Sequence, residues 1–429
     1  MKKKYRIILY TSIFLLCVVA SIILVVKKSN SVYEEESKPK VVKHKSMLSM
    51  NLEQTAGSGD YKTVTQSKWP TEGYKFNAEL SRCENGSTLS WDDTKKAVIV
   101  SGNLSDKCYV YFDIYQPTLA EYIKSQYTGT QGENSIYYHN SSLENGAGDN
   151  SYRYAGANPN NFVCFGSDAS PCPIDNLYRI IGVFGENYHG ANGKQLVKLI
   201  KYDYMTTDEL GTDGDYSQTY KEWGMDSTYK GTYGDGERIG VYYWNYKATG
   251  SATNTWSTSL LNKTNLNTNF INNIGTTWAN KIATVTWKVG GNTWANIGTK
   301  TSSVAYTNEI TNPVTTNTTD NATTYSAKIG LMYVSDYGFA ASPDAWTLTM
   351  SSYNNTTATN NNWMYMGLYE WTISRDAGTS DTAFGVYYDG YVNYNYVDLS
   401  IGVRASFNLE SSVSYVSGSG SMSDPIVIN

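Results

Sequence analysis

The sequence predicts a β-rich α+β protein, and three observations lead to this fold class. Tyr and Gly are abundant, with 38 and 36 residues, whereas charged residues make up only 17% of the chain. Such a composition suits strands whose polar faces use hydroxyls and amides instead of charges. Apolar residues fall mainly in short runs broken by turn formers, as strands require. The chain of 429 residues also exceeds one average domain, so two or three units are expected.

The first 28 residues predict a membrane anchor. Lysine-rich residues 1–6 precede an uninterrupted apolar run, residues 7–26, which is followed by two lysines. A helix of this length spans about 30 Å, the thickness of the hydrocarbon core of a bilayer. The positive-inside rule then gives a single-pass cell-membrane protein with a cytoplasmic tail and an extracellular C-terminal part. A cleaved signal peptide ending near Ala20 is the alternative, but the apolar run continues to Val26.

Three segments are expected after the anchor. Residues 27–60 show no sustained apolar period and are expected to form a linker. Residues 61–115 contain "KAVIVSG" and "CYVYFDIY", short runs of strand formers that indicate a small all-β module. Residues 116–429 are expected to form one larger domain.

Four cysteines follow the anchor: Cys83, Cys108, Cys164 and Cys172. An even number in an exported chain permits two disulfides, in any of three pairings. We favour the pairing that is local in sequence, Cys83–Cys108 with Cys164–Cys172. Reduced, buried thiols are the alternative.

The larger domain begins with the clearest helical pattern outside the anchor, "TLAEYIKSQY" at residues 118–127. Leu177–Phe184 and Gln195–Tyr202 predict a hairpin, because a linker rich in turn formers joins them. Residues 256–274 place Leu and Phe at roughly helical spacing and predict one or two short helices. The Thr/Asn-rich residues 299–326 are expected to be a surface loop. Residues 327–340, "AKIGLMYVSDYGFA", predict a core strand and a turn, and several short strands are expected after them.

Nothing in the sequence supports catalysis, a cofactor or a metal. Only three histidines occur, and HExxH, CxxC, GxSxG and P-loop motifs are missing. Two acidic clusters offer hard oxygens to calcium without the full spacing of a calcium loop: Asp213 with Asp215, and Asp235 with Glu237. The net charge of -5 provides no basic surface, so nucleic acid is not an expected partner. We therefore expect a binding protein and not an enzyme.

One C-terminal segment has an unusual polar composition. In "GVYYDGYVNYNYVDLSIGVR", residues 385–404, valines alternate with Tyr, Asn and Asp. Any half-buried strand alternates, with valines inward and polar residues outward. Tyr and Asn, however, also provide rigid contact area and adaptable hydrogen bonds at binding surfaces. The candidate ligand-binding residues are Tyr387, Tyr388, Asp389, Tyr391, Asn393, Tyr394, Asn395, Tyr396 and Asp398.

The order of several short motifs resembles a known group of domains. "NLYRIIGVF", "KIGLMYVSDYGFA", "EWTISRDAG" and a closing "GVR" are similar to successive blocks in uncharacterised surface domains of gut Firmicutes. Those domains look like relatives of the C-type-lectin-like fold found in formylglycine-generating-enzyme-like domains and in variable proteins of diversity-generating retroelements. The resemblance covers roughly residues 117–429 and implies a C-type-lectin-like domain there. Its scaffold positions correspond to Trp371, Ser374, Arg375, Gly402, Val403 and Arg404.

The resemblance implies that Arg404 is a buried or half-buried charge that needs a partner. Ala405 replaces the proline of the family pattern, and the calcium-and-sugar tripeptides of calcium-dependent lectins are missing. Calcium-dependent sugar binding is therefore not implied.

The resemblance also implies a reason for the bias toward Tyr, Asn and Asp. In retroelement-diversified proteins, mutation of adenines in Asn codons produces Tyr, Asp or His, and all nine candidate residues fit this set. The implied function is that of a membrane-anchored adhesin or receptor-like protein whose variable face binds an extracellular protein or glycan. A cell-surface enzyme, either a formylglycine-type oxidase or a carbohydrate-active domain, and a self-assembling envelope protein are the alternatives.

Overall fold

The structure is a computed structural model that describes residues 48–65, 69–70, 73–103, 105–185, 189, 193–314 and 322–429. The predicted cytoplasmic tail, membrane anchor and first part of the linker lie outside the described residues. Within those ranges, no helix has both the length and the apolar character needed to cross a membrane. The chain divides into two compact units, with the division between Tyr115 and Gln116.

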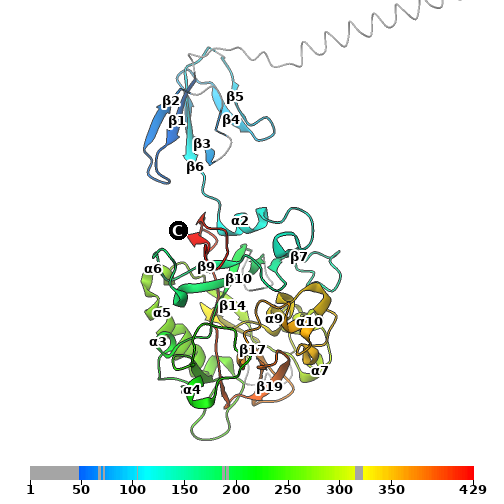
Figure 1. The fold of residues 1–429 in the computed structure, drawn as a ribbon. Helices are drawn as coiled ribbons and strands as arrows, with labels where there is room; N and C mark the ends of the chain where they lie inside the picture. The colour runs from blue at the N-terminus through cyan, green and yellow to red at the C-terminus, as the bar shows by residue number, and fades with distance from the viewer. Residues whose placement is uncertain are drawn as a thin grey trace, which may run out of the picture. The chain divides into compact units, whose positions relative to one another are not determined.

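The first unit is a small β module whose described strands are β1 (Leu48–Glu53), β2 (Tyr61–Val64), β3 (Tyr74–Cys83), β4 (Thr88–Asp92), β5 (Ala97–Ser101) and β6 (Cys108–Ile114). One sheet has the order β2-β1-β6-β3, and β4 pairs with β5 in a separate hairpin (Figure 1). The predicted Cys83–Cys108 disulfide is present and joins β3 to β6 at directly paired positions.

Strand β1 corrects the expectation that residues 27–60 form only a linker. It pairs in parallel with β6 and antiparallel with β2. Met50 and Leu52 are buried in the same cluster as Val110 and Phe112. A two-residue apolar period over only six residues is hard to see within a polar segment, but a module this small needs those side chains to complete its core.

The second unit is β-rich and contains several sheets. Its strands are β7 (Ile136–Tyr138), β8 (Tyr152–Tyr154), β9 (Phe162–Cys164), β10 (Leu177–Phe184), β11 (Leu196–Lys201), β12 (Tyr216–Thr219), β13 (Gly240–Tyr243), β14 (Val285–Lys288), β15 (Thr324–Ala327), β16 (Ile329–Gly330), β17 (Glu370–Arg375), β18 (Thr382–Val386), β19 (Val392–Tyr396), β20 (Ser400–Ile401), β21 (Ser406–Asn408), β22 (Tyr415–Ser417) and β23 (Val427–Ile428). The largest sheet has the order β16-β21-β11-β10-β8-β7, with β9 also paired to β10. A smaller sheet, β17-β18-β19, carries the candidate segment.

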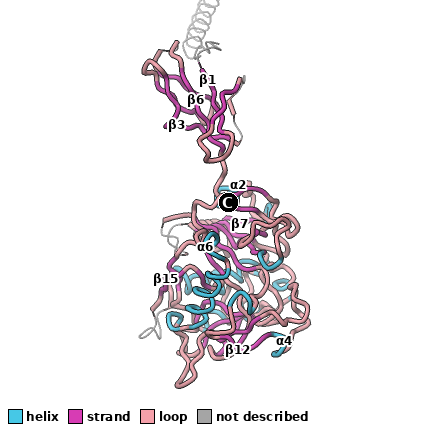
Figure 2. Tube along the Cα trace, turned by 90° about the vertical axis from the view of Figure 1, so that its left-hand side faces the viewer, coloured by secondary structure: helices cyan, strands magenta, loops and turns pink. Residues whose placement is uncertain are grey.

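Short helices and helical turns connect these strands. They are α2 (Leu119–Ser125), η1 (Glu133–Ser135), η2 (Ile174–Asn176), α3 (Thr207–Leu210), α4 (Tyr220–Trp223), η3 (Trp256–Thr258), η4 (Leu261–Phe270), α5 (Ile271–Asn273), α6 (Gly275–Ala279), α7 (Trp294–Ile297), α8 (Ser302–Tyr306), η5 (Thr307–Thr311), α9 (Val334–Ala340), η6 (Pro343–Ala345), η7 (Met350–Ser352) and α10 (Thr356–Thr359). Figures 1 and 2 both show α2, β7 and the C-terminus at one end of this unit and α4 at the other. Strand β19 lies toward the α4 end (Figure 1).

Three sequence predictions for this unit are confirmed. The helix expected at residues 118–127 is α2, which begins with a capping box between Thr118 and Glu121. The predicted hairpin is the antiparallel pair β10–β11, in which every residue is buried. The helical spacing of residues 256–274 corresponds to η4 and its neighbours, because Leu261, Leu266 and Phe270 all face the core.

Two other predictions were wrong. Residues 299–326 are not simply a surface loop, since α8 and η5 form there and bury Tyr306 and Ile310; residues 315–321 lie outside the described residues. In residues 327–340 the strand is only β16, and the expected turn is helix α9. All seven residues of α9 are buried. A helix buried on every side has no amphipathic period, so its sequence does not distinguish it from a core strand and turn.

The β17-β18-β19 sheet separates two hydrophobic cores. Trp371, Ile373 and Ala383 belong to the larger core, whereas Phe384, Val386 and Val392 belong to the second. Every residue of β17 and β18 is buried. The sheet is therefore a densely packed base for the hairpin that follows β18.

Candidate functional site

The candidate segment forms the β18–β19 hairpin and its turn, Tyr387–Tyr391. The register pairs Val386 with Val392 at the turn. Within the turn, the Tyr387 amide donates to the Tyr391 carbonyl at 2.9 Å and the Gly390 amide donates to the Tyr387 carbonyl at 2.8 Å. Gly390 has a φ of 100°, in the left-handed region that glycine adopts without strain.

Side chains from outside the segment hold this turn by its backbone carbonyls. The Tyr388 carbonyl accepts hydrogen bonds from the Tyr365 hydroxyl at 2.5 Å and from the Thr228 hydroxyl at 3.1 Å. The Gly390 carbonyl accepts a hydrogen bond from the Tyr337 hydroxyl at 2.7 Å. The backbone position of the turn therefore depends mainly on its surroundings and little on its own side chains.

Five aromatic rings contact one another over this turn, and we call them the aromatic face: Trp223, Tyr369, Tyr387, Tyr388 and Tyr391. The ring of Tyr369 lies 4.7 Å from that of Tyr387 and 5.3 Å from that of Tyr388, measured between centroids. The Tyr387 and Tyr391 rings are 4.5 Å apart. Trp223, on α4, lies 5.5 Å from Tyr369 and is 40% exposed. Three chain segments far apart in sequence thus contribute to one surface.

Tyr394 and Tyr396 are the most exposed candidate tyrosines, at 41% and 56%. The Tyr394 ring lies 5.7 Å from Trp294, which is itself 36% exposed. Asp398 is exposed as well. Large apolar rings in water are unfavourable unless something covers them, so clustered exposed rings mark a contact surface.

The structure corrects the expected inward-and-outward alternation. Val392 shares a strand face with Tyr394 and Tyr396, whereas Asn393 and Asn395 lie on the opposite face. Asn395 is buried, at 9% exposure, so it is not a surface residue as expected. Both faces of this short sheet pack against a hydrophobic core. The exposure of a β19 residue therefore depends on its position along the strand as well as on the face that it occupies.

Three candidate residues bond to one another inside the hairpin. The Tyr387 hydroxyl donates to Asn395 Oδ1 at 2.7 Å and accepts from Asn393 Nδ2 at 3.4 Å. Burial raises the pKa of Tyr387 to about 12, so this hydroxyl keeps its proton at neutral pH. Tyr387, Asn393 and Asn395 consequently shape the face, while Tyr391, Tyr394 and Tyr396 are better placed to contact a ligand.

Unsatisfied polar atoms also gather in this segment. Among the described residues, Asp389 Oδ1, Asn393 Oδ1 and Asn395 Nδ2 are buried without a hydrogen-bond partner in the protein. Buried polar atoms are nearly always paired, with protein groups or with ordered water. Three such atoms lie within seven residues, so the interior of this hairpin is less completely hydrogen-bonded than the strands around it.

The scaffold residues bring the "EWTISR" strand and the closing "GVR" motif side by side beneath the aromatic face. Glu370 and Gly402 are bridged in parallel: the Trp371 amide donates to the Gly402 carbonyl, and the Gly402 amide to the Tyr369 carbonyl, both at 3.0 Å. Arg404 Nε donates to Glu370 Oε1 at 2.8 Å, and both side chains are at most 2% exposed. A Cβ on residue 402 would lie only 2.8 Å from the Tyr204 ring, so the backbone can pass this close to Tyr204 only with glycine at this position.

The other scaffold positions are also buried. The Trp371 indole donates to the Tyr242 carbonyl at 2.8 Å. The Ser374 hydroxyl donates to Glu309, a buried carboxyl that also accepts from the first amides of α9. Arg375 Nε donates to the Val289 carbonyl at 3.2 Å. These contacts fix β17, the strand that begins next to Tyr369.

Sequence reasoning missed Trp223 and Trp294 as members of the surface. Each is an aromatic residue of a four-residue helix, in a segment with no other candidate feature. Local sequence around them contains no signal, because their importance comes only from the tertiary contact with Tyr369 and Tyr394.

Sequence reasoning also missed a buried network of charges. Lys198 Nζ donates to Asp336 at 2.5 Å, and Arg153 donates to Asp149 at 2.7 Å. These four side chains are at most 1% exposed. The network therefore packs the interior and does not extend the surface site.

The remaining sequence candidates lie away from the aromatic face. The predicted Cys164–Cys172 disulfide is present and begins in β9. Asp215 accepts from the Leu261 amide at 2.8 Å, at the start of η4, and Asp235 accepts from the Glu237 amide at 3.0 Å within a turn. In the part of the chain that the structure describes, no group of three or more His, Cys, Asp or Glu side chains is arranged to hold a metal ion.

By its structure, the chain is a β-rich protein with several sheets and two disulfides. Comparison with known proteins adds no relationship, since no family model, curated protein or solved structure matches the chain significantly.

Proposed function

We propose that this chain is a membrane-anchored extracellular binding protein, of the adhesin or receptor type, whose aromatic face, together with the exposed rings of Tyr394 and Tyr396 on the same hairpin, binds a protein or glycan. The observation that carries the proposal is the contact of five rings from α4, the start of β17 and the β18–β19 turn on one surface. Tyrosine supplies large, rigid contact area with a polar tip, and its ring faces stack on sugars and on apolar side chains.

The packing beneath the rings supports binding. The β17 and β18 strands are buried throughout, and the Arg404–Glu370 pair lies one residue from Tyr369. A ligand therefore meets a surface that is already ordered, which lowers the entropic cost of association. Hot spots of interfaces are commonly aromatic residues held in this way.

We further propose that the face is variable and that the second unit is C-type-lectin-like. The turn backbone is held at Tyr388 and Gly390 by outside hydroxyls, so side chains within the segment can change without loss of the loop conformation. The parallel bridge between Glu370 and Gly402 supports the lectin-like assignment, because it unites the two motifs on which the resemblance rests. A reverse transcriptase gene beside a near-copy of the segment's coding sequence would support diversification.

The test is a binding screen with purified full-length chain. Arrays of extracellular glycans and of extracellular protein domains are probed with the wild type and with a Tyr394→Ala/Tyr396→Ala variant. The proposal predicts at least one array partner that the variant no longer binds. Binding that is identical for both proteins, or none on either array, contradicts it. Turnover of an arrayed glycan, or self-association alone, would favour the enzymatic or the structural alternative.

A further inference from the structure

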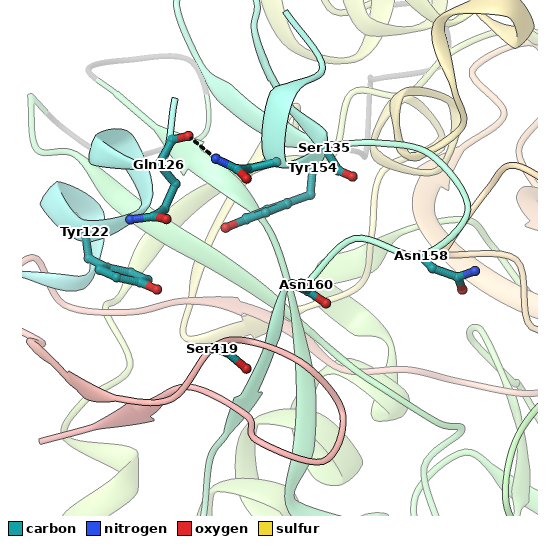
Figure 3. Close-up of a pocket in the computed structure, with 8 residues that line it drawn as sticks. Tyr122, Gln126, Ser135, Tyr154, Asn158, Asn160 and Ser419 are labelled. Atoms are coloured by element: carbon teal, nitrogen blue, oxygen red, sulfur yellow. Dashed lines mark hydrogen bonds between the residues drawn. The ribbon is translucent and has the colours of Figure 1, made fainter. Parts of the chain in front are cut away.

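A polar hollow lies at the end of the second unit that carries α2, β7 and the C-terminus, away from the aromatic face (Figure 1). Its volume is about 160 Å³. The side chains come from α2, the turns before β7, β8, the loop after β8 and the loop after β22 (Figure 3). Its lining residues are Tyr122, Gln126, Asn134, Ser135, Tyr154, Asn158, Asn160 and Ser419.

Tyr154 is the buried polar group of this site. The residue is 4% exposed, and its hydroxyl points into the hollow between α2 and Asn160 (Figure 3). That hydroxyl makes no hydrogen bond with any residue that the structure describes, although the Tyr154 carbonyl accepts one from Trp363 at 2.9 Å. Burial raises the pKa of Tyr154, so its proton stays available for donation. The Tyr154 oxygen is not among the fully buried unpaired atoms of the described residues, so it is open to the hollow and can donate to a bound acceptor.

The rest of the lining is polar and uncharged. Asn158 and Asn160 are exposed at the rim, and their side chains form no hydrogen bonds to the described residues. The Asn134 side chain is fixed by donating to the Gln126 backbone carbonyl at 2.8 Å. Amides and hydroxyls offer both donors and acceptors, and no Lys, Arg, Asp or Glu contributes to the lining.

The backbone at the rim is held in an uncommon conformation. Asn134 and Ser135 have φ values of 54° and 59°, so two consecutive non-glycine residues lie in the left-handed region. Such residues carry strain that the surrounding structure must offset, and they gather at ligand sites. Both Asn134 and Ser135 line the hollow.

The Tyr122 ring forms one wall of the hollow, and a second aromatic ring supports it. The Tyr122 ring stacks on Tyr415 with centroids 3.7 Å apart and an angle of 6° between the planes. The Tyr415 hydroxyl in turn donates to the Gly418 carbonyl at 3.1 Å, in the loop that also carries Ser419. The ring of Tyr122 therefore forms a fixed, flat edge beside the polar groups.

We infer that this hollow is a binding site for a neutral saccharide and that it takes one sugar ring. Hydroxyls of a sugar match the unpaired Tyr154 hydroxyl and the rim amides, and its C–H face matches the Tyr122 ring. The volume is well below the roughly 300–1,000 Å³ of sites for drug-sized ligands, so the hollow has room for one sugar ring. A phosphate or carboxylate would lose its hydration without meeting a lining cation. This site does not depend on the function proposed for the aromatic face.

The experiment is saturation-transfer NMR on the purified full-length chain. The probes are glucose, galactose, mannose, N-acetylglucosamine and N-acetylgalactosamine, each also as its methyl glycoside, with sialic acid as the charged comparison. Saturation transfer to at least one neutral sugar is expected. Equal transfer to the methyl glycoside identifies the terminal residue of a glycan as the natural ligand, and loss of transfer identifies the free sugar.

Two variants locate the site. Tyr154→Phe removes only the buried hydroxyl, and Asn160→Ala changes an exposed rim residue that folding does not need. Each is expected to weaken binding of the responding sugar about tenfold, the effect of one lost hydrogen bond. The Tyr394→Ala/Tyr396→Ala variant is expected to bind that sugar as the wild type does, which separates this site from the hairpin surface proposed to bind a protein or glycan. The inference is overturned by transfer to none of the neutral sugars, by transfer to sialic acid alone, or by affinities unchanged in both site variants.

Discussion

Arg404 Nε donates to Glu370 Oε1 at 2.8 Å, with both side chains almost fully buried beneath the aromatic face. The pair joins Arg404, the last residue of the "GVR" motif, to Glu370, the first residue of β17 and the neighbour of Tyr369. Tyr369 in turn contacts the Tyr387 ring at 4.7 Å. A continuous chain of contacts therefore connects the buried ion pair to the surface that we propose as the binding site.

Breaking this pair is expected to destabilise the second unit strongly. Arg404→Met would leave the Glu370 carboxylate buried without its partner, and the expected loss is about 3–5 kcal/mol in the free energy of unfolding. Denaturant unfolding measures it. The control is Arg238→Met, because Arg238 is 46% exposed in its ion pair with Asp175, and exposed pairs contribute at most about 1 kcal/mol. Equal effects of the two substitutions would contradict a structural role for Arg404.

Gly390 is expected to be the least replaceable residue of the turn. An alanine Cβ there would lie 2.7 Å from Thr359 Cγ2 and 3.0 Å from the Tyr353 carbonyl. Gly129 has the same φ of +100° with open space around it. Gly129→Ala therefore introduces the same backbone strain without a steric clash. We expect Gly390→Ala to cost about 1–3 kcal/mol more than Gly129→Ala in thermal or denaturant unfolding. Equal costs would mean that the turn is loosely packed.

The stability of the second unit is expected to depend on pH through Glu309. Burial raises the pKa of this carboxyl to about 7 from its usual value of 4.5. Between these two pH values the folded state binds the proton and the unfolded state does not, so this contribution to stability falls as pH rises. The difference corresponds to about 3 kcal/mol. Since buried histidines titrate in the opposite sense, the quantity to measure is the stability of the wild type relative to Glu309→Gln at pH 4.5 and pH 8.

The comparison with Glu309→Gln has a definite sign. The wild type is expected to lose stability relative to the variant between pH 4.5 and pH 8, because Gln carries no titrating proton. Gln keeps one acceptor oxygen, for the Ser374 hydroxyl and the Val334 amide, and its loss of the Ser335 hydrogen bond is the same at both pH values. A flat difference, or one that favours the wild type at high pH, contradicts the assignment.

The Cys83–Cys108 disulfide is expected to stabilise the first unit by about 2–4 kcal/mol, since it closes a 25-residue separation around a small core. A Cys83→Ala/Cys108→Ala variant should lower the unfolding transition of that unit and leave the transition of the second unit unchanged. Removing Cys164–Cys172, with a separation of only 8 residues, should have a smaller effect. Calorimetry resolves the two transitions, and a larger loss from the shorter loop would refute this ranking.

Sequence patterns predicted those elements whose signals are local. The capping box of α2 and the turn formers between β10 and β11 are readable within a few residues. The cysteine pairing was predicted because each cysteine is bonded to its neighbour in the cysteine order of the exported part, at separations of 25 and 8 residues. Helix α9 was misread because complete burial removes its polar face. Strand β1 was missed because it completes a sheet with a partner, β6, that lies 60 residues away.

The candidate site was predictable only in part, for the same reason. Composition pointed to the Tyr/Asn segment, and Tyr394 and Tyr396 are indeed exposed. The burial of Asn395 follows from its bond to Tyr387 across the hairpin, and the membership of Trp223 follows from its contact with Tyr369. Both depend on tertiary packing that no local pattern records.

The central claim is that the exposed tyrosines bind a partner and do not stabilise the fold. The direct measurement compares the wild type, Tyr394→Ala/Tyr396→Ala and Tyr138→Ala, a control on β7 at the other end of the unit. For each protein, affinity for the responding array partner and the thermal unfolding midpoint are measured together. Our account predicts at least a hundredfold loss of affinity for the double variant, with a midpoint within about 2 °C of the wild type, and wild-type affinity for Tyr138→Ala. Unchanged affinity of the double variant, or a midpoint lowered by many degrees, would contradict it.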